Sequence, residues 1–70
     1  MDNLTEKQIS KIHGALFCHA VEASRNQKLL GAEELEELEY WNHEKHERIE
    51  TLRAFEDAMQ LHRITGFGID

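Results

Sequence analysis

The sequence predicts an all-α protein built as an antiparallel helical hairpin. Its 70 residues contain no proline, and apolar residues recur at steps of three and four on both sides of Gly31, a pattern typical of amphipathic helices. We therefore predict one hairpin domain over residues 1–70. It has a first helix over 5–30, a turn over 30–32, a second helix over 32–64 and a flexible tail over 65–70.

The first helix has a start signal at Thr5. The stretch Thr5-Glu6-Lys7-Gln8 has the form of a capping box, in which the side chains of the first and fourth residues each bond a backbone N–H of the other. Gly14 lies inside this helix and costs about 1 kcal/mol relative to alanine. The helix either tolerates this glycine or needs its small size for a close contact.

The second helix is expected to place Glu33 and Glu34 in its first turn, where carboxylates interact favourably with the helix dipole. Its apolar seam is interrupted at Asn42 and Lys45, inside the polar run 42–48. This run is compatible with a polar layer in a continuous helix, with a break that kinks the helix, or with a functional surface. The absence of glycine and proline from residues 33–64 favours the continuous helix.

A hairpin of this size leaves apolar surface uncovered. Below about 70–80 residues a single core rarely supplies more than roughly 3–5 kcal/mol, and the single cysteine, Cys18, excludes an intrachain disulfide. We therefore expect the chain to pair with itself as a homodimer or a higher helical bundle. The apolar stripes predict the core of that assembly: Ile9, Ile12, Leu16, Leu35, Leu38, Ile49, Leu52 and Met59.

The charge balance narrows the choice of partners. Eight basic and fourteen acidic residues give a formal charge of −6, which repels a phosphate backbone, argues against nucleic acid and favours a basic protein surface. No apolar run approaches the roughly 18–20 residues of a membrane span, and the first residues, MDNLTEKQ, are polar. We therefore expect neither a membrane partner nor a signal peptide, and a cytoplasmic location.

A candidate metal site lies on the second helix. Glu39, His43, His46 and Glu50 follow one another at steps of four, three and four, so they share one helix face. With the turn near Gly31, His19 is expected level with His43 and would add a further ligand. Such a set suits zinc, although its spacing matches no established zinc motif, and a solvated helix face explains the same residues. We expect no other cofactor.

Recognition of another protein is predicted at Tyr40 and Trp41, because aromatic residues are enriched at interface hot spots. The two side chains point to different sides of the helix, so one is expected to face outward; alternatively, Trp41 belongs to the oligomer core. Arg48 and Phe67 are further candidates for partner binding. No nucleophile elbow, phosphate-binding loop or catalytic triad pattern is present, so we do not expect an enzyme.

The hairpin resembles the small plasmid-encoded Rop hairpin in length, in turn position and in its tail, where Phe67 lies between two glycines. The resemblance implies a dimeric four-helix bundle that binds a pair of RNA loops. No motif specific to Rop aligns, so none of its RNA-binding residues is carried over. Lys7, Lys11 and Arg25 form only a thin basic stripe on the first helix.

The leading functional hypothesis is a small acidic protein-binding module, a regulator or inhibitor of the phage or mobile-element type, that covers a surface of another protein. One alternative is an oligomer that sequesters a small ligand or zinc at a site between subunits. Another is a Rop-like RNA-binding regulator.

Overall fold

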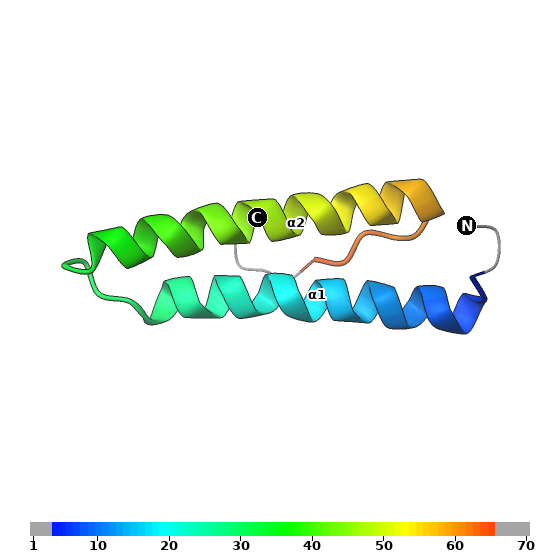
Figure 1. Ribbon diagram of the computed structural model, residues 1–70, viewed down its shortest axis with the longest axis horizontal. Helices are drawn as coiled ribbons and strands as arrows, with labels where there is room; N and C mark the ends of the chain where they lie inside the picture. The colour runs from blue at the N-terminus through cyan, green and yellow to red at the C-terminus, as the bar shows by residue number, and fades with distance from the viewer. Residues whose placement is uncertain (1–3, 66–70) are drawn as a thin grey trace.

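Two long antiparallel helices form the protein, as Figure 1 shows. The computed structural model describes residues 4–65. Helix α1 spans Glu6–Leu29 and helix α2 spans Leu35–Met59. The predicted all-α helical hairpin is confirmed. None of the described helices combines the length and apolar character needed to cross a membrane.

The predicted capping box is present at the start of α1. The backbone N–H of Gln8 donates to Oγ1 of Thr5 at 3.1 Å, and the backbone N–H of Thr5 donates to Oε1 of Gln8 at 2.9 Å. Each side chain therefore satisfies a backbone donor that has no partner within the helix, which fixes where α1 begins.

The connection between the helices is longer than the predicted turn over 30–32. Leu30 is extended, with φ −87° and ψ 146°. The N–H of Glu34 donates to the carbonyl of Gly31 at 3.1 Å, and the N–H of Gly31 donates to Oε2 of Glu34 at 2.8 Å. Glu34 is thus held before the helix, and α2 begins at Leu35 and not at residue 32. Glu36 and Glu37, and not Glu33 and Glu34, occupy its first turn.

This connection also changes the register of the hairpin. Extended residues advance the chain by about 3.3 Å each, compared with 1.5 Å in a helix. The extended connection therefore shifts which residues of α2 face a given residue of α1. Nη1 of Arg48 donates to the backbone carbonyl of His19 at 3.0 Å. His19 is therefore level with Arg48, and its predicted position level with His43 is wrong.

The polar run 42–48 lies inside α2 without a break, so the predicted continuous helix is confirmed and the second helix has no kinking break there. Nε2 of Gln27 donates to Oδ1 of Asn42 at 3.1 Å, which links α1 to α2. Lys45 is buried. Of the two residues that interrupt the apolar seam, Lys45 thus lies buried between the helices, and Asn42 is exposed and bonds α1 at the edge of the contact.

The end of α2 differs from the prediction of a helix to residue 64. The helix ends at Met59, and Gln60 adopts the left-handed conformation with φ 58° and ψ 44°. The N–H of Gln60 then donates to the carbonyl of Asp57, and the N–H of Leu61 to the carbonyl of Glu56, as in a Schellman motif. Residues 60–65, here called the return segment, run back along the hairpin (Figure 1).

The buried apolar core of the described chain is small. It consists of Ala20, Ala23, Ile49 and Leu52. Leu16, Phe17 and Val21 are partly buried and pack against it. Ile49 and Leu52, which were predicted for an oligomer core, are already buried between the two helices of one chain.

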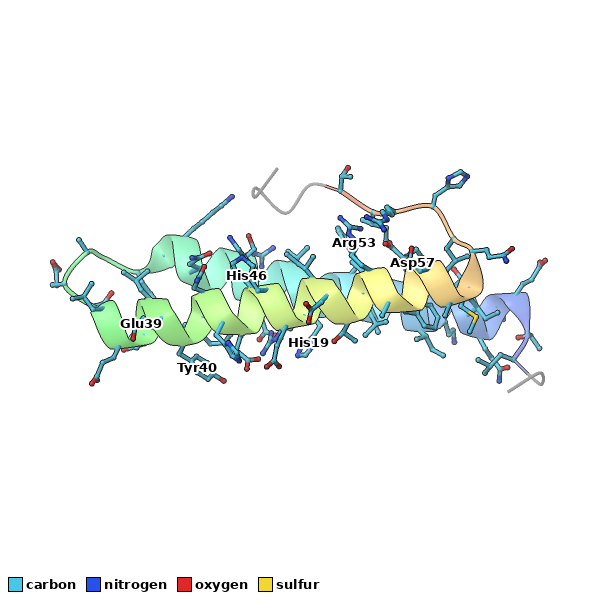
Figure 2. All side chains as sticks on the ribbon, turned by 90° about the horizontal axis from the view of Figure 1, so that it is seen from above. His19, Glu39, Tyr40, His46, Arg53 and Asp57 are labelled. Atoms are coloured by element: carbon cyan, nitrogen blue, oxygen red, sulfur yellow. The ribbon has the colours of Figure 1, made fainter. Side chains whose placement is uncertain are left out.

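The two helices leave a flank on each side of their contact. The return segment lies along one, the covered flank, together with Arg53 and Asp57, whereas Tyr40 and His19 point to the opposite side (Figure 2). No described residue outside the two helices is seen to cover that opposite side, here called the open flank. It carries Ile12, Leu16, His19 and Glu22 of α1, and Tyr40, Trp41, Glu44, Glu47, Arg48 and Thr51 of α2.

Candidate functional site

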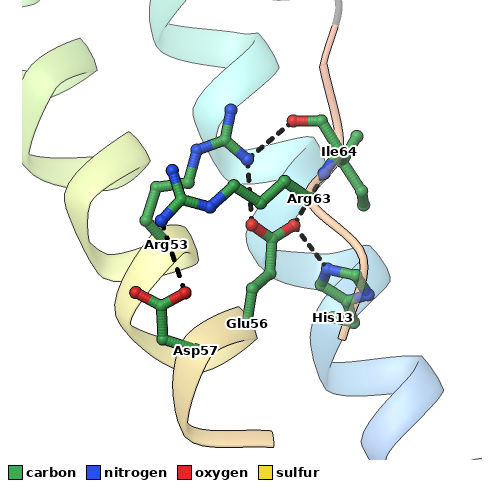
Figure 3. A network of polar contacts seen from close by, with 6 residues as sticks. All are labelled: His13, Arg53, Glu56, Asp57, Arg63 and Ile64. Atoms are coloured by element: carbon green, nitrogen blue, oxygen red, sulfur yellow. Dashed lines mark hydrogen bonds and ion pairs between the residues drawn. The ribbon is translucent and has the colours of Figure 1, made fainter. Parts of the chain in front are cut away.

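Glu56 forms the most connected polar contact of the described chain. Its side chain is fully buried. Oε2 accepts a hydrogen bond from Nε2 of His13 and another from the backbone N–H of Ile64, each at 2.8 Å, and Oε1 accepts one from Nη1 of Arg53 at 2.9 Å (Figure 3). Arg53 also donates to the carbonyl of Ile64 at 2.7 Å. One carboxylate thus joins α1, α2 and the return segment.

These contacts decide the charge state of Glu56. Burial alone would raise the pKa of its carboxyl group. The hydrogen bonds from His13, from the Ile64 backbone and from Arg53, together with the positive charge of Arg53, outweigh burial and lower that pKa below its ordinary value. Glu56 is therefore ionised near neutral pH. Because a carboxylate only accepts hydrogen bonds, Nε2 of His13 is the nitrogen that carries the proton.

The open flank is built around Trp41. The ring of Tyr40 meets the ring of Trp41 edge-on, with centroids 5.0 Å apart, and the guanidinium carbon of Arg48 lies 5.4 Å from the centroid of Trp41. Tyr40 is 54% exposed. Of the two neighbouring aromatic residues, Tyr40 is thus the one that faces outward, and Trp41 is half-buried beneath the arginine.

Arg48 ties the two helices together along this flank. Its Nε donates to Oε1 of Glu44 at 3.1 Å, and its Nη1 donates to Oε1 of Glu22 at 3.2 Å and to the carbonyl of His19. Its side chain is only 12% exposed. The charge of this predicted partner-binding residue is therefore already balanced within the chain.

Next to Arg48 the open flank is hollowed. The hollow has a volume of about 310 Å³. Its lining has one apolar side chain and two carboxylates, and consists of Leu16, His19, Glu44, Glu47, Arg48 and Thr51. Ile12, one helical turn before Leu16, is 37% exposed. The flank therefore offers an apolar surface with an acidic edge, but no deep pocket.

The other predicted core residues are spread along the hairpin. Ile9, Leu38 and Met59 are half-buried, whereas Leu35 is 67% exposed at the start of α2. Phe67, predicted to bind a partner, lies outside the described residues.

The predicted metal ligands are not brought together. Nε2 of His43 lies 2.8 Å from Oε2 of Glu47, and Nδ1 of His46 lies 2.8 Å from the backbone carbonyl of Asn42. His19 is level with Arg48. Over residues 4–65 no three His, Cys, Asp or Glu side chains are grouped closely enough to hold a metal ion.

Lys45 is unusual because it is buried without an acidic partner among residues 4–65. Burial lowers the pKa of its ammonium group, and the positive charge of Lys28 lowers it further. Its apolar stem fills the contact between the helices at a level where an apolar residue would be the usual choice.

Sequence reasoning missed Glu56 and Arg53 as a linked pair. Their spacing of three residues on α2 is a common arrangement for an ion pair, but nothing in the sequence shows that Ile64 returns to meet them. Comparison with protein families, with curated proteins and with solved structures gives no match to this chain. The class that the fold itself defines is the two-helix antiparallel hairpin.

Proposed function

We propose that this protein is a protein-binding module that covers its open flank with a helix of another chain, and that it acts as a regulator or inhibitor by occluding a surface of that chain. The observation that carries the proposal is the exposure of Ile12, beside Leu16, and of Tyr40, beside Trp41, at the two ends of a flank that no described segment covers. Exposed apolar surface of this kind is typical of association sites.

The small core supports the same proposal. Only Ile49 and Leu52 contribute large apolar side chains to it, because the other two members are alanines. Burial of further apolar area at the open flank would add the stabilisation that a hairpin of this length needs. In the absence of another partner, a second copy can cover the flank, which is the homodimer or higher helical bundle expected from the apolar stripes.

The substitution Ile12→Glu tests the proposal, because Ile12 is exposed in the single chain and its loss leaves the hairpin core intact. The mass in solution, measured by light scattering over a range of concentrations, should rise with concentration for the natural sequence and stay at one chain for Ile12→Glu. Cys18→Glu, an equal charge change at an exposed position of α1, is the control and should associate normally.

The opposite result is also informative. A mass of one chain at every concentration, with identical melting curves for the natural sequence and both variants, would mean that the open flank takes no part in self-association. Failure to retain any protein or helical peptide on the immobilised chain would then overturn the proposed function.

A further inference from the structure

The charges of the open flank distinguish its possible occupants. Three carboxylates lie along it, those of Glu22, Glu44 and Glu47, and the guanidinium of Arg48 is the only arginine or lysine group that the described structure places there. That guanidinium already pairs with Glu22 and Glu44, at 3.2 Å and 3.1 Å. The remaining charge at the rim is negative.

A second copy, which can cover the flank when no other partner is present, matches this surface less well than a basic partner does. Two open flanks packed face to face would bring six carboxylates and two guanidinium groups into one interface, and like charges across an interface disfavour the pairing. The overall charge of −6 adds to that repulsion. A chain with positive side chains would instead gain attraction at the same places.

We propose that the occupant of the open flank is a basic amphipathic helix of another protein. This inference rests on the proposed function and names the chemistry of its partner. The apolar stripe of the incoming helix packs against Ile12, Leu16 and Trp41, and its lysine or arginine side chains reach the free carboxylate oxygens at the rim. This is the helix-in-groove mode of recognition.

The size of the surface suits such a helix. The open flank follows α1 from Ile12 to Glu22 and α2 from Trp41 to Thr51. Because the helices are antiparallel, with Gln27 bonded to Asn42 and His13 to Glu56, these two stretches overlap only in part. The flank is therefore about 24 Å long from Trp41 to Ile12, or between four and five helical turns. Apolar residues at steps of three and four on the partner would place about four anchors along that length.

Three synthetic peptides of equal length test the inference. The first is an amphipathic helix of lysine and leucine, the second replaces lysine with glutamate, and the third has the composition of the first with its leucines spread around the helix. The fluorescence of Trp41, the only tryptophan of the chain, reports binding, and mass in solution gives the stoichiometry. Only the first peptide should bind, as a complex of one chain with one peptide.

Charge-reversal variants of the protein are the second part of the test. The double variant Glu22→Lys with Glu47→Lys should weaken binding of the first peptide about tenfold, because two favourable surface pairs become unfavourable. The double variant Glu36→Lys with Glu50→Lys makes the same change in net charge on exposed positions of α2 outside the open flank, and is expected to reduce the affinity by much less.

The outcomes separate this inference from the proposed function. Equal binding of the acidic or the scrambled peptide, or equal weakening by the two double variants, would overturn the basic-helix partner. If the natural chain self-associates through Ile12 and binds none of the peptides, a second copy is the occupant, so this inference fails while the proposed function stands. If neither self-association nor peptide binding occurs, this inference fails, and the proposed function fails with it when the immobilised chain also retains no other protein or helical peptide.

Discussion

Nε2 of His13 lies 2.8 Å from Oε2 of Glu56, across 43 positions of sequence and between the two helices. The same oxygen accepts the backbone N–H of Ile64. A buried carboxylate is costly unless its acceptor positions are filled, and here His13, Arg53 and Ile64 fill them. The position of the return segment is therefore coupled to the packing of α1 on α2.

Glu56→Gln should lower the free energy of unfolding by about 2 kcal/mol, because hydrogen bonds to a charged acceptor are replaced by weaker ones and the amide NH₂ meets other donors. Urea unfolding followed by circular dichroism measures the loss, and amide exchange at Ile64 should speed up at the same time. Glu50→Gln, at an exposed position of the same helix, is the control. Equal stability of the two variants would contradict the role given to Glu56.

The free energy of unfolding should also depend on pH through the carboxyl group of Glu56. Hydrogen bonds and the charge of Arg53 outweigh burial and hold the pKa of Glu56 below its ordinary value of 4.5. A carboxyl group with a lowered folded-state pKa contributes stability above its unfolded-state pKa, and that contribution is lost as the pH falls through the folded-state value. The stability gap between the natural sequence and Glu56→Gln should thus be constant above about pH 5 and shrink below about pH 4. A gap that does not change with pH would show that the pKa of Glu56 is the same in the folded and unfolded states.

Lys45→Met should stabilise the hairpin by about 1 kcal/mol, because an apolar side chain of similar length replaces an ammonium group that has no acidic partner among the described residues. Thermal melting at neutral pH measures the gain, and Lys11→Met at an exposed site of α1 is the comparison. A loss of stability would indicate that the charge of Lys45 is used, by an acid or an anion.

Gln60→Gly is expected to raise stability by up to about 1 kcal/mol, because glycine adopts the left-handed conformation without the steric cost that glutamine bears there. Gln60→Val should lower it, since a β-branched side chain fits that conformation worst. If both substitutions have the same effect in denaturant titration, the backbone of residue 60 is not left-handed in solution.

Gly14→Ala should raise the melting temperature, with a gain of about 1 kcal/mol, because a methyl group at this helical position would have no heavy atom within 4 Å. The measurement is made at a low and at a high protein concentration. Destabilisation that appears only at the high concentration would place Gly14 in a close contact between chains.

The sequence contains enough information to predict the two helices and the start of α1, but not the end of α2. Thr5 and Gln8 define the start of α1 through a local motif, and local motifs can be read from the order of residues. The end of α2 depends on contacts from Glu56 and Arg53 to Ile64, which are made only after the chain reverses. No glycine or proline marks Gln60, so helix propensity alone continues the helix to residue 64.

Of the residues on the open flank, the sequence pointed to the two aromatic ones. Tyr40 and Trp41 could be singled out because large aromatic residues on a polar helix are conspicuous, and the structure places Tyr40 outward. The neighbours contributed by α1, His19 and Leu16, depend on the register of the hairpin. Adding or removing two extended residues in the connection would shift that register by more than one helical turn. The pattern of apolar residues does not determine how many residues of the connection are extended.

The return segment gives the hairpin two unequal sides. A bare pair of helices could accept a neighbour on both faces and so stack one after another into an open-ended fibre. Residues 60–65 lie along one face and are held there through Ile64, so the proposed docking on the open flank would add a partner on one face only and give a finite complex.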